Sequence, residues 1–258
     1  MHTKQLIMRH ISSLIGRLML VEILFLASFT FICPKAHSQG TVQQHLSLTA
    51  YGLFDRHLAT GNAPGGALLL NWKPSDPVSL RGGIQVADGL GVAGKLEGSA
   101  TLIKNPKDHR LALENSYLWR HFPQWGLQEF TSALQLAWYA DHIQLHLGLC
   151  NRYVASLIQR SDVSATILEP MNVMFAAEGW LFSLGQPKSW NVRLRWSNYG
   201  DFFVERVSEW TFSLKGRYAL NDNLDLMAEV GTHPVGSLNL TASYDGWFGH
   251  LGLNWNIK

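Results

Sequence analysis

The chain has 258 residues, with 21 basic and 19 acidic side chains and a formal net charge of +2 at pH 7. No charge block, low-complexity tract or linker interrupts it after residue 38. This near-neutral balance does not favour nucleic acid as a partner, and the length suits one domain with a substantial interior.

Residues 1–38 have the features of an export signal. Basic residues precede an apolar run at residues 18–32, and Ala36-His37-Ser38 carries small residues at the two positions that signal peptidase reads. We expect the mature chain to begin at Gln39. A membrane anchor is the alternative, which the short apolar run and Glu22 disfavour.

The remaining domain, residues 39–258, differs in charge from the whole chain. Loss of residues 1–38 takes away four basic side chains and one acidic side chain, so the formal net charge changes from +2 to −1. Cys150 is then the one cysteine left, and no intramolecular disulfide is expected.

Short runs of alternating apolar and polar residues recur through this domain, separated by Gly, Pro, Asn and Asp, with no convincing amphipathic helix. Side chains alternate between the two faces of a strand, so the pattern predicts an all-β domain. In chain order the runs are 46–54, 67–72, 78–86, 90–102, 111–119, 130–138, 143–153, 171–181, 192–196, 212–218, 224–230, 238–244 and 247–257.

These are thirteen runs, whereas closed bacterial barrels have an even number of strands. Ala67–Trp72 is the weakest run, so about twelve strands are predicted, within a range of roughly ten to fourteen. A break at Thr232-His233-Pro234 and a two-residue hairpin at Asp245-Gly246 would separate the last three runs. Residues 155–170 are left unassigned.

Two all-β architectures fit the alternation. A soluble exported β-sandwich, such as a binding protein, would bury the apolar faces, whereas a membrane barrel would turn them toward lipid. Long runs, aromatic residues near strand ends and a final strand at the end of the sequence favour the barrel. The aromatic residues are Trp72, Trp119, Trp138, Trp196, Tyr218, Tyr244 and Trp247. The charged residues lie on the opposite face of the runs: Arg81, Lys95, Glu97, Glu129, Arg152, Glu178, Arg193, Arg195, Lys215, Arg217, Asp225 and Glu229.

In this pattern the mature chain resembles the bacterial outer-membrane β-barrel superfamily over its whole length. The resemblance implies a closed antiparallel transmembrane β-barrel in the outer membrane of a Gram-negative bacterium, in contact with outer-membrane lipid. We expect no cofactor, and the oligomeric state stays open.

One group of charged residues lies on consecutive strands at positions whose side chains are predicted to face the barrel interior. It consists of Arg193, Arg195, Lys215 and Arg217, flanked by Glu178, Asp225 and Glu229. The bases could form a positive ladder that guides small anionic solutes through a narrow, porin-like pore. Alternatively, each base pairs with an acid and the ladder plugs a purely structural barrel.

A different function is suggested by the segment Arg195-Trp196-Ser197-Asn198-Tyr199-Gly200. It is similar to the His-x-Ser-Asn segment of outer-membrane lipid A deacylases and acyl hydrolases, which implies Ser197 as a weak candidate nucleophile. Arg195 stands where the His should be, and an arginine cannot act as a general base near neutral pH. Hydrolysis would therefore need His146 or His250 to reach Ser197.

A metal site is not expected. His146 and Cys150 share a face, but four residues of a strand span roughly 13 Å, which is too far for one ion.

Overall fold

The computed structural model describes residues 45–57, 61–75, 77–88, 91–105, 109–123, 126–156, 166–184, 190–203, 210–235 and 244–257. All of them belong to one unit, residues 42–258. The predicted signal peptide, residues 1–38, lies outside the described residues. No helix that could span a membrane occurs within the described ranges.

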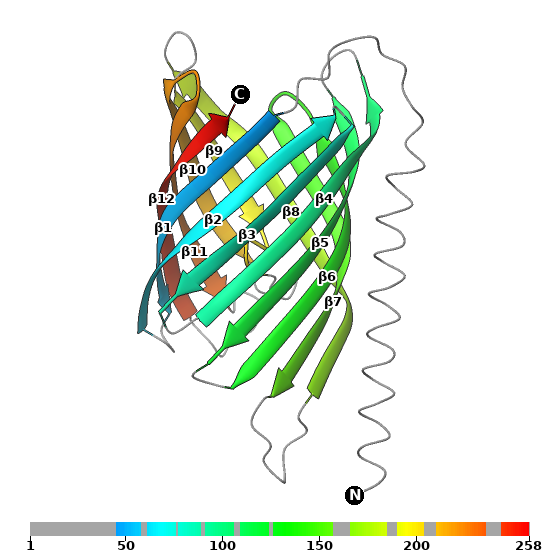
Figure 1. Cartoon of the computed structure of the whole chain (residues 1–258), viewed down its shortest axis with the longest axis vertical. Helices are drawn as coiled ribbons and strands as arrows, with labels where there is room; N and C mark the ends of the chain where they lie inside the picture. Colours follow the sequence, from blue (N-terminus) through cyan, green and yellow to red (C-terminus); the bar gives the residue numbers. More distant parts are fainter. Residues whose placement is uncertain are drawn as a thin grey trace, which may run out of the picture. The chain divides into compact units, whose positions relative to one another are not determined.

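The described part of the chain forms twelve strands. They are β1 (His45–His57), β2 (Gly61–Ser75), β3 (Val78–Ala87), β4 (Gly91–Lys104), β5 (Arg110–Phe122), β6 (Leu127–Tyr139), β7 (Ile143–Ser156), β8 (Thr166–Leu184), β9 (Trp190–Ser197), β10 (Thr211–Asn221), β11 (Leu224–Val235) and β12 (Tyr244–Ile257). Each strand pairs antiparallel with its sequence neighbours, and β12 pairs with β1, which closes the sheet into a barrel (Figure 1). The predicted twelve-stranded antiparallel barrel is confirmed.

The closing seam is continuous. β1 and β12 are in register from Leu46↔Ile257 to Arg56↔Trp247, without a bulge. Closure matters because a sheet edge facing lipid would leave backbone N–H and C=O groups without hydrogen-bond partners.

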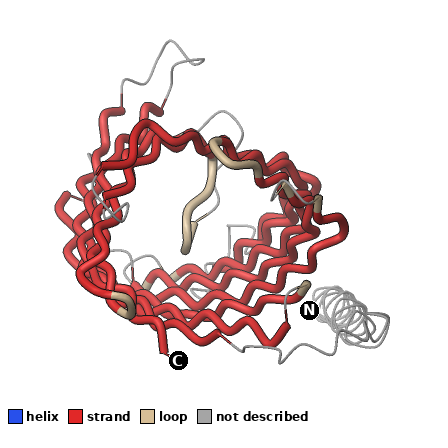
Figure 2. Tube along the Cα trace, turned by 90° about the horizontal axis from the view of Figure 1, so that it is seen from above, coloured by secondary structure: helices blue, strands red, loops and turns tan. Residues whose placement is uncertain are grey.

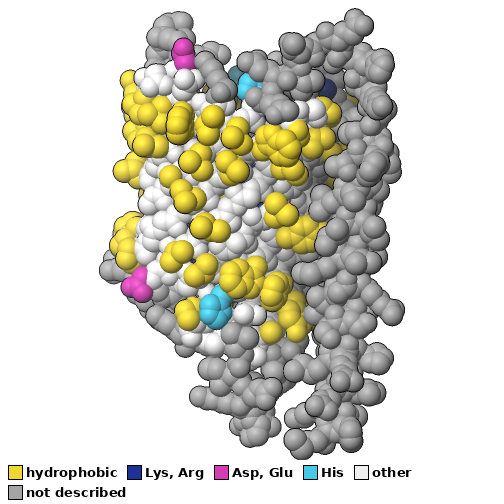
Figure 3. All heavy atoms as spheres, viewed as in Figure 1, with side chains coloured by type: hydrophobic (Ala, Val, Ile, Leu, Met, Phe, Trp, Pro, Cys, Tyr) yellow, Lys and Arg dark blue, Asp and Glu magenta, His cyan; other side chains and the backbone are white. Residues whose placement is uncertain are grey.

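The side-chain distribution is inverted relative to a soluble protein. Leu147 and Leu251 point outward and are 64% and 62% exposed, whereas the inward carboxylate side chain of Glu129 is 2% exposed. On the face seen in Figure 3, hydrophobic side chains cover the strands and the few charged ones lie near the two ends. The soluble sandwich with a buried apolar core is therefore excluded. The apolar exterior suits lipid contact.

Three local predictions are wrong, and the first is the break at Thr232-His233-Pro234, which lies inside β11. Ala67–Trp72, taken as the weakest run, lies within β2 and pairs with both β1 and β3. The supposed hairpin Asp245-Gly246 lies inside β12, opposite Pro234 and His233 of β11. The pairing of two long strands therefore outweighs this local turn signal. Most of the predicted run 238–244 lies outside the described residues.

Pro234 is tolerated inside β11 for a physical reason. The pairing of β11 with β10 ends at Phe212↔Thr232, so Pro234 has a partner strand on one side only. Proline has no backbone N–H and is accepted where no ladder hydrogen bond is needed.

Glycines on the inward face leave room for large neighbouring side chains, and Gly252 is the clearest case. A Cβ at Gly252 would collide with the carbonyl oxygen of Ala50 and with Tyr51 on β1. We predict that Gly252→Ala destabilises the barrel by about 1–3 kcal/mol because backbone atoms must shift. Urea unfolding of the protein in lipid vesicles measures this loss.

Gly249→Ala on the same strand is the matched control. A Cβ there would approach no atom closer than the Glu229 carbonyl oxygen at 3.9 Å, an ordinary contact. Equal stability of the two variants would contradict the close approach of β1 and β12 at Gly252.

Candidate functional site in the barrel lumen

The site begins where the barrel wall is interrupted. β9 has 8 residues, whereas its neighbour β8 has 19. The β8–β9 pairing ends at Ala176↔Ser197, and the chain then leaves the wall and runs inside the ring of strands, as Figure 2 shows. We call residues 198–203 the lumen segment.

Asn198 completes the hydrogen bonding of β8 at this point. The backbone N–H of Phe175 donates to Asn198 Oδ1 at 2.9 Å, and Asn198 Nδ2 donates to the carbonyl oxygen of Val173 at 2.8 Å. The Asn198 N–H also donates to the Phe175 carbonyl at 3.2 Å. A side-chain amide carries the same donor and acceptor as a peptide group, so Asn198 substitutes for the next residue of the missing strand.

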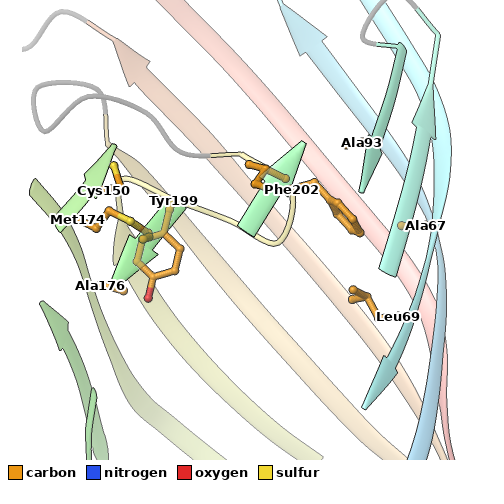
Figure 4. Packing of buried hydrophobic residues seen from close by; sticks show 10 residues of the cluster. Ala67, Leu69, Ala93, Cys150, Met174, Ala176, Tyr199 and Phe202 are labelled. Atoms are coloured by element: carbon orange, nitrogen blue, oxygen red, sulfur yellow. The ribbon is translucent and has the colours of Figure 1, made fainter. Parts of the chain in front are cut away.

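Two aromatic residues of the lumen segment pack against two distant parts of the barrel wall. Tyr199 and Phe202 are buried and belong to an apolar cluster inside the barrel. Figure 4 shows Tyr199 beside Met174 and Ala176 of β8, and Phe202 on the side of Leu69 of β2. The segment therefore crosses the lumen and packs on the wall formed by β2 to β8.

Arg195 and Ser197 shape the turn into the lumen. Arg195 Nε donates to Ser197 Oγ at 3.0 Å, and Arg195 Nη2 donates to the Tyr199 carbonyl oxygen at 3.1 Å. The Ser197 hydroxyl donates to the same carbonyl at 2.9 Å and lies 3.3 Å from Thr211 Oγ1. These contacts give both side chains a clear structural role.

No described histidine is a partner of Ser197. His250 Nδ1 lies 3.4 Å from Glu229, and His146 Nδ1 lies 3.3 Å from Glu114 of β5. Among the described residues, no histidine therefore serves Ser197 as a general base. Within the same residues no group of three or more His, Cys, Asp or Glu side chains could hold a metal ion.

Asp201 lies at the inner part of the lumen segment and contacts the opposite wall. Its Oδ1 forms an ion pair with Arg81 Nη1 of β3 at 2.9 Å. Tyr51 of β1 lines the same part of the lumen as this carboxylate. Burial alone would raise the pKa of Asp201, but the positive charges of Arg81, Lys95, Lys215 and Arg195 outweigh it and hold the pKa below its ordinary value. Asp201 therefore remains ionised at neutral pH.

The predicted ladder residues come together on the wall formed by β8 to β11. Their ion pairs join neighbouring strands: Arg193 Nη1 to Glu178 Oε1 at 2.8 Å, Arg195 Nη1 to Glu178 Oε2 at 3.8 Å, Lys215 Nζ to Glu229 Oε2 at 3.7 Å, and Arg217 Nη2 to Asp225 Oδ2 at 2.6 Å. Each base thus has an acid within reach, and the pairs lie along the wall.

Two cavities lie on either side of Arg81. The first, of about 280 Å³, is lined by the four ladder bases together with Tyr51, Arg81, Asp201 and the acids Glu178 and Glu229. The second, of about 560 Å³, is lined by residues such as His45, Lys73 and Asn256, at the end of the barrel where β1 begins and β12 ends. Arg81 lines both. The Arg81–Asp201 pair therefore lies at the boundary between them.

The alternation in the sequence places the ladder on one inner face but does not reveal the lumen segment. Asn198 and Tyr199 fall in the segment that resembles an enzyme motif, and Asp201 and Phe202 belong to no predicted run. The available signal is the shortness of the run 192–196, which has 5 residues, whereas the neighbouring runs 171–181 and 212–218 have 11 and 7.

Comparisons with known proteins show likeness in fold alone. No protein-family model matches the sequence, and no curated protein is similar to it in sequence. A solved structure of the KdgM porin in complex with disordered oligogalacturonate has a TM-score of 0.54 and 11% identity, covering 82% of this chain and 99% of that chain. Omp33 of Acinetobacter baumannii has a TM-score of 0.48 and 8% identity, covering 84% and 100%. The chain has the fold of the outer-membrane β-barrel proteins.

Asn198 should be needed for the stability of the interrupted wall. Asn198→Ala leaves the N–H of Phe175 and the C=O of Val173, both part-buried, without these partners, at a cost of about 1–3 kcal/mol for each unsatisfied group. We expect a lower free energy of unfolding in vesicles, followed by tryptophan fluorescence during urea titration.

Asn191→Ala is the matched control for this change. Asn191 lies on β9, the strand that precedes Asn198, and its side chain accepts a 3.3 Å hydrogen bond from Arg193 Nε. A similar, small effect of both substitutions would show that Asn198 does not complete β8.

Proposed function

We propose that the protein is a narrow, porin-like channel of the outer membrane that passes small anionic solutes. The supporting observation is the direction of the ion pairs. Arg193, Lys215 and Arg217 pair with acids on adjacent strands, so their side chains lie along the wall. The lumen beside them keeps the cavity of about 280 Å³.

The route of a solute follows the two sides of the lumen. On one side of the lumen, Tyr199 and Phe202 pack in the apolar cluster and leave no room for a solute beside the wall of β2 to β8. The wall of β9 to β12, together with β1 and β3, borders the first cavity. A solute would therefore pass along the charged wall and cross between the two cavities at Arg81.

The charges of the first cavity favour anions. Its lining includes five cationic side chains, Arg81, Arg193, Arg195, Lys215 and Arg217, and three carboxylates, Glu178, Asp201 and Glu229. A ring of mainly basic side chains raises the local concentration of anions and lowers that of cations.

Connection lengths support an orientation. The strands that precede the longer connections, β7, β9 and β11, end opposite the barrel end that holds His45 and Ile257. Barrels of this fold have short periplasmic turns and longer extracellular loops. We therefore orient the second cavity toward the periplasm.

Single-channel recording in a planar bilayer tests this function. The wild type should give discrete openings of low conductance, with anions more permeant than cations in a salt gradient. Arg193→Gln should lower the anion-to-cation permeability ratio by about two- to fivefold, because one cationic side chain of the first cavity is lost.

Lys104→Gln removes the same charge at the end of β4, outside the residues that line either cavity, and should leave the ratio unchanged. A correctly folded wild type that never conducts would instead identify a plugged barrel. Cation selectivity would exclude the role proposed for the ladder.

A further inference from the structure

We propose that Arg81 and Tyr51 form a carboxylate-binding site in the lumen, which the protein's own Asp201 occupies as a tethered ligand. A small solute with a carboxylate group would bind at the same place when the Asp201 side chain turns away. This inference deepens the proposed channel function, because it names the solute class and the residues that recognise it.

The position of Asp201 distinguishes it from the other acids of the lumen. Glu178, Asp225 and Glu229 are carried by wall strands and pair with bases on the neighbouring strand. Asp201 is carried by the lumen segment and meets Arg81 on β3, a strand that is not a neighbour of β9 or β10. It therefore reaches Arg81 from within the lumen, as a solute would.

The groups around the Asp201 carboxylate have the chemistry of an anion receptor. The guanidinium group of Arg81 offers several N–H donors in a plane that matches a carboxylate, and the Tyr51 hydroxyl adds another donor. Arg195 and Lys215 line the same cavity from the other side. Cationic groups thus approach one carboxylate position from two walls.

Exchange between Asp201 and a solute is physically accessible. The Arg81 and Asp201 side chains are 30% and 33% exposed, in contrast to the 2% exposure of the Glu129 side chain in its pairs with Arg120 and Arg152. Water therefore reaches the Arg81–Asp201 pair, and this partial exposure lowers the free-energy cost of opening the ion pair. A tethered carboxylate competes through its high effective concentration, which weakens solute binding without abolishing it.

Isothermal titration of the purified full-length protein in detergent tests the site, with succinate as the carboxylate probe and 1,4-butanediol as the uncharged control. Asp201→Asn removes the tethered charge and keeps the side-chain volume. We expect it to bind succinate at least about tenfold more tightly than the wild type, because the internal competitor is gone. Butanediol should bind neither to the wild type nor to the Asp201→Asn variant.

Asp141→Asn is the control. It makes the same change at an exposed residue between β6 and β7 that lines neither cavity. It should bind succinate like the wild type. Adding Arg81→Gln to Asp201→Asn should remove the gain. If Asp201→Asn does not refold, Asp201→Ser serves as the second variant, with the same expected gain.

No gain in a folded Asp201 variant would overturn the proposal, as would an equal gain in Asp141→Asn or a gain that survives Arg81→Gln. Titration does not depend on conduction. A barrel that is silent in bilayers but gains succinate binding would refute the channel and keep the site. A barrel that conducts but shows no gain in succinate binding would refute the carboxylate site and keep the channel.

Discussion

The requirement that every backbone N–H and C=O group within a bilayer has a hydrogen-bond partner governs this structure. Eleven of the strand junctions join sequence neighbours, and the β1–β12 seam closes the ring. The wall breaks this regularity where β9 ends after Ser197 while β8 continues. Asn198 bonds to the exposed backbone of Val173 and Phe175 there.

The same interruption produces the candidate site. Because the chain leaves the wall at Ser197, the next residues are free to enter the lumen, where Phe202 docks in the apolar cluster and Asp201 meets Arg81. Arg195 fixes the turn through Ser197 and the Tyr199 carbonyl. The departure of the chain from the wall after Ser197 thus accounts for three features. These are the end of β9, the packing inside the lumen and the charged pair at the boundary between the two cavities.

The sequence predicted what depends on strand periodicity. The barrel, the outward apolar face and the inward ladder all follow from alternation, which is a property of each strand alone. Alternation indicated thirteen strands, and the number twelve came from the rule that closed bacterial barrels have an even number. Pairing between distant residues is not visible in that pattern. Asp245-Gly246 therefore looked like a turn although it pairs with β11, and Asp201 showed no link to Arg81, 120 positions earlier. The resemblance around Ser197 came from a segment that in fact ends a strand.

A double-mutant cycle on Arg81 and Asp201 tests most directly whether the lumen segment lies where it is described. The free energy of unfolding in vesicles is measured for the wild type, Arg81→Ala, Asp201→Ala and the double variant. Since the two side chains touch at 2.9 Å and are partly exposed, the account predicts a favourable coupling energy of about 1 kcal/mol. Strictly additive effects would contradict the contact, and with it the position of the lumen segment.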